Sequence, residues 1–122
     1  MPQPRVDADS SRERVVVTKA VRRAAQKLGL THAQLAEVLG VSASTVSRLE
    51  STPLSRPKAV ELALLLIRVY RSLIGVVGTD EAAAQWLAAE NSYLQGRPVD
   101  LLQRVEGLTQ TLGYLDAMRA RV

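Results

Sequence analysis

The chain has 122 residues and a mass of 13.3 kDa, a length that fits one domain or two small ones sharing a core. It has no cysteine and one histidine, His32, which excludes disulfide frameworks, histidine-cluster or thiolate metal sites, and thiol catalysis. The net charge of +4 is uneven, because residues 1–58 hold ten Lys and Arg against five Asp and Glu, whereas residues 59–122 hold six against seven. Only the front half is therefore expected to meet a polyanion.

The first helix is predicted from Ser10 to about Leu28. Residues 1–10 contain two prolines and two aspartates and have little to bury, so we expect a disordered tail there. Ser10 and Glu13 have the spacing of a capping box, which marks a helix start. A buried face is predicted by apolar residues at helical spacing: Val17, Ala20, Val21, Ala24 and Leu28. Gly29 fits a left-handed cap after this helix.

Two short helices are predicted next. Thr31 and Gln34 repeat the capping-box spacing and indicate a helix that Gly40 ends. Residues 42–51 form the third predicted helix, which the serine at its start can cap. A proline-containing turn over residues 52–57 leads into the fourth helix.

The fourth predicted helix is long and apolar, from Pro57 to Val77, and proline suits its first turn. It is apolar around most of its circumference, so we expect it to be buried on several sides and to join both halves. Its longest uninterrupted apolar run is six residues, far short of the roughly 20 that a membrane span needs. The N-terminus has no targeting segment, and we expect a soluble, cytoplasmic protein.

Three further helices and no strand are predicted in the rear of the chain. Gly78 ends the long helix, a short helix spans residues 79–90, and residues 91–96 form a bent connection. Pro98 opens another short helix, and the last helix begins near Val105. An amphipathic stripe recurs at steps of three or four residues through Leu101, Val105, Leu108, Leu112, Leu115 and Met118. The predicted fold class is therefore all-α.

Residues 31–50 match the helix-turn-helix of phage-repressor-like proteins. Ala36 is small where the two helices cross, and Gly40 takes a positive φ that a side chain would strain. The core between the helices is filled by Leu35, Leu39, Val41, Val46 and Leu49. In this geometry the second helix of the motif enters the major groove of DNA, with its N-terminal residues facing the base edges.

Arg48 is the only side chain of this recognition helix able to contact guanine with two hydrogen bonds. The other residues expected at the groove are small: Ser42, Ala43, Ser44, Thr45 and Ser47. Gln34 and the amides at the helix starts should hold phosphates. Salt-dependent affinity is expected from Arg22, Arg23, Lys27, Arg56 and Lys58. The alternative for these basic residues is a solvated helix face, and His32 is expected at the surface near a phosphate.

The rear half has no enzyme signature. Its candidate acids are Glu81, Glu90, Asp100, Glu106 and Asp116. Nothing in their spacing brings carboxylates together in a cleft, as general acid–base chemistry requires, so they are interpreted as solvated helix charges. Gly75 and Gly78 lack the context of a phosphate-binding loop. We expect no catalytic residues, no metal and no cofactor.

A series of short elements follows the long helix: Trp86-Leu87, Asn91, Leu94, Gly96-Arg97-Pro98, Asp100-Leu101-Leu102, Glu106-Gly107-Leu108 and Tyr114-Leu115. This series resembles the toxin-binding domain of Xre/MbcA/ParS-type antitoxins. With the upstream helix-turn-helix, the resemblance covers residues 15–122. It implies an antitoxin of a type II toxin–antitoxin system, with a phage-repressor-like helix-turn-helix domain over residues 11–58 merged with a helical toxin-binding domain over residues 59–122.

The resemblance also implies a partner, a RES-domain toxin with an ADP-ribosyltransferase-like fold that degrades NAD or uses it to ADP-ribosylate a host enzyme. The C-terminal region of the antitoxin is implied to cover the active-site cleft of the toxin. The N-terminal half is implied to bind double-stranded operator DNA and repress its own operon. A homodimer within a larger toxin–antitoxin complex is expected, because this motif usually binds paired half-sites.

Candidate toxin-binding residues are Trp86, Asn91, Arg97, Tyr114, Arg119, Arg121 and Val122. We expect the end of the last helix to enter the toxin cleft and block NAD. Structural alternatives stay open for several rear residues. Trp86 can anchor the core, Asn91 can cap a helix end or bond a backbone carbonyl, and Asp100 can stabilise a helix start. Gly96 and Pro98 can shape a tight turn into the next helix.

Two other functions remain open. One is a stand-alone helix-turn-helix repressor whose rear half dimerises or senses a ligand. The other is an enzyme, which the single histidine, the missing cysteine and the lack of paired acids disfavour. The combination of the GRPxDLL and EGL elements favours the antitoxin over both.

Overall fold

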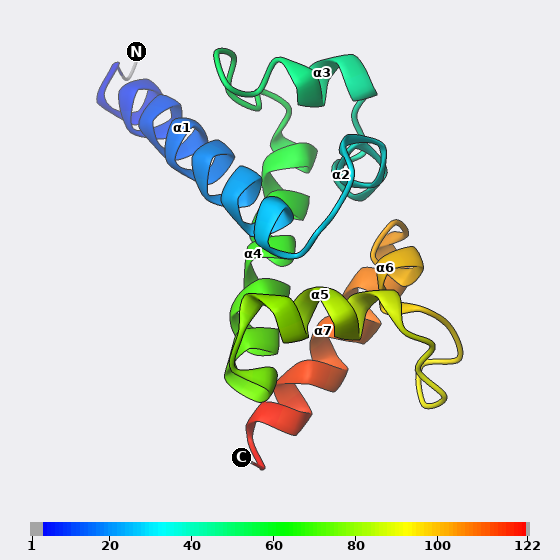
Figure 1. Cartoon of the computed structure of the whole chain (residues 1–122). Helices are drawn as coiled ribbons and strands as arrows, with labels where there is room; N and C mark the ends of the chain where they lie inside the picture. Colours follow the sequence, from blue (N-terminus) through cyan, green and yellow to red (C-terminus); the bar gives the residue numbers. More distant parts are fainter. Residues whose placement is uncertain (1–3, 122) are drawn as a thin grey trace.

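The computed structural model describes the backbone of residues 4–121 and the side chains of residues 10–121. Within that range the chain forms seven helices: α1 Pro4–Lys27, α2 His32–Leu39, α3 Ala43–Ser47, α4 Pro57–Val77, α5 Asp80–Ala88, α6 Pro98–Leu101 and α7 Val105–Arg119. The one β-type pairing in the described residues is an isolated bridge between Asn91 and Gly96. The predicted all-α class is confirmed (Figure 1).

The predicted start of the first helix at Ser10 is wrong, because α1 begins at Pro4. The tail predicted over residues 1–10 is therefore helical from residue 4, and residues 1–3 lie outside the described residues. Proline at a first helical position has the φ angle of a helix already fixed, and its missing N–H needs no partner there. Pro4 was the start signal, and the Ser10–Glu13 pair lies inside the helix.

The capping signals of the next two helices are confirmed. The Thr31 hydroxyl accepts the backbone N–H of Gln34 at 3.0 Å, and the Gln34 side chain accepts the N–H of Thr31 at 2.9 Å. Gly40 ends α2 with a φ of 68°. The Ser42 hydroxyl caps α3 by accepting the N–H of Thr45 at 3.1 Å.

The third helix is shorter than predicted, because α3 ends at Ser47 and not at Ser51. Beyond it the backbone tightens into turns of three residues, in which the N–H of Arg48 bonds the carbonyl of Thr45 at 3.1 Å. The N–H of Ser51 repeats this pattern on the carbonyl of Arg48 at 3.1 Å. Arg48 therefore lies in the cap of α3 rather than in the helix.

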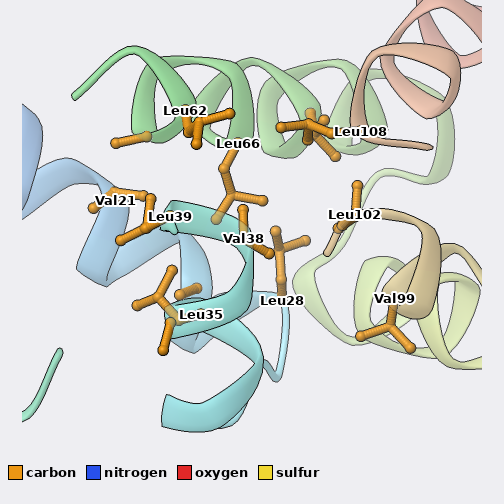
Figure 2. Packing of buried hydrophobic residues seen from close by; sticks show 14 of the residues in the cluster. Val21, Leu28, Leu35, Val38, Leu39, Leu62, Leu66, Val99, Leu102 and Leu108 are labelled. Carbon is orange, nitrogen blue, oxygen red and sulfur yellow. The ribbon is translucent and has the colours of Figure 1, made fainter. Parts of the chain in front are cut away.

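α4 has the predicted bounds and joins the two halves. Its buried residues are Ala59, Leu62, Ala63, Leu66, Val69, Ser72 and Leu73. It packs against α1, α2, α5 and α7, so that one buried cluster includes residues of both halves. Figure 2 shows this cluster along α4, with Leu39 from α2 and Leu102 and Leu108 from the rear half. No helix among the described residues is long and apolar enough to cross a membrane.

The stripe predicted for the last helix is partly wrong. Leu108, Leu112 and Leu115 are buried, but Val105 is 50% exposed. Val105 is the first residue of α7, and the helix meets the preceding turn through Gly107 instead. Leu102 is fully buried, whereas the predicted Leu101 is half-buried.

Hydrogen bonds and a cation–π contact join neighbouring helices. The Tyr70 hydroxyl on α4 donates to Asp80 Oδ1 on α5 at 2.7 Å, and this hydrogen bond, with burial and the aspartate charge, raises the pKa of Tyr70. The Lys27 ammonium from α1 lies 5.6 Å from the centroid of the Tyr70 ring. Between α4 and α7, the Ser72 hydroxyl donates to Asp116 Oδ1 at 2.6 Å.

Candidate functional sites

The residues predicted to face DNA lie together at the start of α3. Thr45 is half-buried, and its hydroxyl lies 2.9 Å from the Ser42 hydroxyl. The other predicted side chains at this surface are exposed: Ser42, Ala43, Ser44, Ser47 and Arg48. Because Ser42 is used as the helix cap, the serines and threonine form a local hydroxyl network around the N-terminus of α3.

Arg48 lines a groove of about 260 Å³ between α3, the turn that follows it and the start of α4. Arg56 lines the same groove, and its guanidinium lies 3.5 Å from the carbonyl oxygen of Gly40. Two exposed guanidinium groups therefore flank the groove beside the predicted recognition helix.

A second groove, of about 610 Å³, lies between α1, α2 and α3. Its polar lining residues are Lys19, Arg22, Arg23, Gln26, His32, Ser47 and Glu50. Arg22 is only partly available, since it forms an ion pair with Glu50 at 3.8 Å. Lys19 joins Arg23 here although it was not predicted as a site residue, because the 3.6-residue period places the two one turn apart on α1.

Three of the predicted DNA-binding side chains make contacts within the chain: Lys27, Lys58 and Gln34. Lys27 lies over the Tyr70 ring, on the side of α1 that faces the rear half. Lys58 pairs with Glu61 at 3.3 Å on α4. Gln34 uses its side-chain oxygen in the capping box, which leaves only its amide NH₂ for a phosphate.

Two of the predicted toxin-binding side chains are engaged within the chain. Arg97 makes a two-pronged contact with Asp100, at 3.0 Å from Nε and 3.2 Å from Nη2, and this carboxylate raises the pKa of Arg97. Asn91 Oδ1 accepts the backbone N–H of Leu94 at 2.9 Å, and the backbone of Asn91 pairs with that of Gly96. These contacts support structural roles, in which Asn91 closes the loop and Arg97 holds the entrance of α6.

Three aromatic side chains, Trp86, Tyr93 and Tyr114, lie together beside α7. The Tyr114 ring stacks on the Tyr93 ring, with centroids 4.9 Å apart. It also stacks on the Trp86 ring, with centroids 6.3 Å apart. Tyr93 and Tyr114 border a groove of about 530 Å³, here called the aromatic groove. Its lining residues are Tyr93, Leu94, Gln110, Gly113, Tyr114, Ala117, Met118 and Arg121. Trp86 is half-buried against the core, as its structural alternative required.

Tyr93 was missed as a site residue. It is 74% exposed, and it lies in the polar connection that sequence reasoning treated as a bent loop. The available signal was composition, because three of the four aromatic residues of the chain fall between positions 86 and 114. Only the folded loop brings Tyr93 against α7.

The arginines predicted near the C-terminus face two different grooves. Arg121 lines the aromatic groove, whereas Arg119 lines a separate groove of about 630 Å³ between α4 and α7. Gly75 gives Arg119 room there, since a Cβ atom at Gly75 would lie 3.0 Å from Arg119 Nε. Val122 lies outside the described residues, and the described part of the chain has no cluster of residues able to hold a metal ion.

Two family models match the chain. The antitoxin Xre-like helix-turn-helix domain matches residues 7–68, and the antitoxin Xre/MbcA/ParS C-terminal toxin-binding domain matches residues 72–121. The chain belongs to the Xre/MbcA/ParS family of antitoxins. It is thus an antitoxin of a toxin–antitoxin system, and its families are regulatory and inhibitory rather than catalytic.

The antitoxin is also similar to a solved chain from the crystal structure of the M. tuberculosis MbcT-MbcA toxin-antitoxin complex. The TM-score is 0.68 at 25% sequence identity, and the match covers 88% of this chain and 96% of that chain. Comparison with curated proteins gives no match. The two family segments of the antitoxin meet at residues 68–72, inside α4, so the boundary predicted at residue 58 stays a prediction.

Proposed function

We propose that this antitoxin neutralises a RES-domain toxin that uses NAD, by covering the toxin active site with its C-terminal region. Its helix-turn-helix binds operator DNA and represses the operon. The observation that carries the proposal is the pairing of a helix-turn-helix segment and a toxin-binding segment on one buried core, with exposed side chains at both ends. A toxin partner is supported by the match of residues 72–121 to a toxin-binding domain.

The arrangement allows both surfaces to be used at the same time. α3 and the C-terminus lie at opposite ends of the molecule (Figure 1). The last described turn of the chain is exposed at Arg119, Ala120 and Arg121, so it can enter a cleft without disturbing the core. A homodimer is part of the proposal, because helix-turn-helix proteins usually bind paired half-sites.

Deletion of residues 118–122 is expected to abolish neutralisation, because it removes the segment proposed to block NAD. Cells that co-express the toxin of the same operon with the truncated antitoxin should stop growing, and NAD consumption by the purified toxin should resume. An Arg104→Ala variant, which changes an exposed arginine at the far end of α7, should still protect the cells. Full protection by a folded truncated antitoxin would remove the C-terminus from the mechanism.

Replacement of Arg48 by alanine is expected to weaken operator binding by about 1–3 kcal/mol, the usual loss for a two-pronged guanine contact. The measurement is fluorescence anisotropy on a promoter fragment of the operon, at several salt concentrations. The matched control is Arg71→Ala, since Arg71 is an exposed arginine on the rear half of α4. If the Arg48 variant keeps the affinity and sequence preference of the unaltered antitoxin, Arg48 does not read the operator.

A further inference from the structure

The aromatic groove presents a side chain that the fold itself does not need. Tyr93 is 74% exposed, while its neighbour Leu94 is only 3% exposed and anchors the loop in the core. The loop is closed by the backbone pairing of Asn91 with Gly96, at 2.9 and 3.2 Å, and by the bond from Leu94 N–H to the Asn91 side chain. Tyr93 is therefore held in place before any partner arrives.

The backbone of this loop is also strained at one position. Gln95 has a φ of 60°, in the left-handed region that residues with a side chain rarely adopt. Together with the stacking of Tyr93 on Tyr114 at 4.9 Å, this conformation sets the position of the exposed ring. A rigid, preordered aromatic ring loses little conformational entropy on binding, which is why such residues dominate protein interfaces.

The floor of the groove is left open by a glycine. Gly113 lies on the exposed side of α7, and a Cβ atom added there would meet no atom within 4 Å. Glycine weakens a helix, and no close approach within the antitoxin requires one at this position. Ala117, one turn further along α7, is also small, so the space between Tyr114 and Met118 can admit a side chain from outside.

The charge of the groove narrows the class of partner. Among the described residues, Arg121 is the only charged one that lines it, Gln110 is polar and uncharged, and none carries a carboxylate. A single positive charge on an aromatic and aliphatic surface suits a protein segment with an apolar side chain and a nearby carboxylate. It does not suit a nucleic acid backbone, which needs several cations.

We propose that the aromatic groove receives an apolar side chain of the toxin, with a carboxylate of the same toxin segment facing Arg121. This inference rests on the proposed function and adds a second contact to it, an anchor on Tyr93 and Gly113 beside the C-terminal end, from which Met118 and Arg121 also line the groove. The toxin is the occupant because every lining residue falls within residues 72–121, which match a toxin-binding domain. Tyr93 and Gly113 are its specificity-determining positions.

The test uses the full-length antitoxin and the purified toxin of the same operon, with the dissociation constant measured by calorimetry. Tyr93→Ala should raise the dissociation constant about 30-fold, the effect expected of an interface hot spot, and Tyr93→Phe should stay near the unaltered value. Gly113→Leu, which fills the floor, should raise it at least about tenfold, whereas Gly113→Ala should change it little. Circular dichroism checks that each variant is folded, and Tyr93→Ala tests the groove even if Gly113→Leu does not fold.

An unchanged dissociation constant for Tyr93→Ala, or for folded Gly113→Leu, would overturn the groove proposal and leave the proposed function standing. A changed oligomeric state of free Gly113→Leu, with toxin binding unaffected, would assign the groove to a second copy of the antitoxin and likewise overturn it. If the unaltered antitoxin does not bind the toxin, the proposed function itself fails.

Discussion

Replacing Gly107 by alanine is expected to destabilise the antitoxin by about 3 kcal/mol. A Cβ atom at this position would collide with the carbonyl oxygen of Leu101 and would lie 2.8 Å from its carbonyl carbon. Both are backbone atoms, which cannot rotate away as a flexible side chain does. The turn between α6 and α7 would have to open, and Leu102 and Leu108, which are almost fully buried beside it, would lose packing.

The matched control lies on the same helix. Gly113→Ala meets no atom within 4 Å, so it should stabilise the antitoxin by up to about 1 kcal/mol through helix propensity alone. Urea unfolding followed by circular dichroism measures both variants under the same conditions. Equal stability of the Gly107 and Gly113 variants would mean that α6 moves away from α7 at little free-energy cost.

The helix ends could be predicted from sequence wherever the signal is local. Thr31 with Gln34, Ser42, Gly40 and Gly78 act within one helical turn of their own positions, and each does what its residue type predicts. Two capping-box patterns were found, however, and only one marks a helix start. The Ser10 pattern failed because Pro4 begins the helix earlier, and capping patterns also occur inside helices.

The end of α3 and the buried face of the α6–α7 segment have no comparable signal in the sequence. Nothing near Arg48 in the sequence shows that the backbone tightens there into three-residue turns. Similarly, Leu101 and Leu102 are equivalent by composition. In the fold, the Leu101 backbone lies against Gly107 and Leu102 is fully buried in the core.

Of the two candidate sites, one could be predicted from the sequence and the other could not. The helix-turn-helix surface follows from regular spacing within about 20 residues, so the exposed set around α3 could be predicted. The aromatic groove could not, because Tyr93 reaches Tyr114 only through a closed loop. The division of Arg119 and Arg121 between two grooves also depends on the folded chain, because α7 ends at Arg119 and Arg121 lies in the turn after it.

The position of α4 between the halves makes a further prediction about folding. One buried cluster includes residues of α2, from the N-terminal half of the chain, and of α7, from the C-terminal half. α4 packs against both helices. If the helix-turn-helix and toxin-binding segments share this core, a cavity in one should lower the stability of the other by the same amount. Small chains with a single core usually unfold in one cooperative transition.

Leu39→Ala is therefore expected to destabilise the whole antitoxin by about 3 kcal/mol, within the range for buried leucines. Leu39 is 1% exposed in α2, in the front half. The only tryptophan, Trp86, lies in α5 in the rear half, so its fluorescence reports unfolding at a distance from the change. The midpoint of urea unfolding should fall equally by Trp86 fluorescence and by circular dichroism of the whole chain.

Leu64→Ala is the matched control, because Leu64 is 43% exposed on α4 and the same substitution there should cost less than about 1 kcal/mol. Two separate transitions in the Leu39 variant, with Trp86 fluorescence unchanged, would mean that the halves unfold independently. Coincident transitions would mean that contacts made at the toxin-binding end stabilise the helix-turn-helix as well, because a partner that binds only the folded state stabilises every part that unfolds with it.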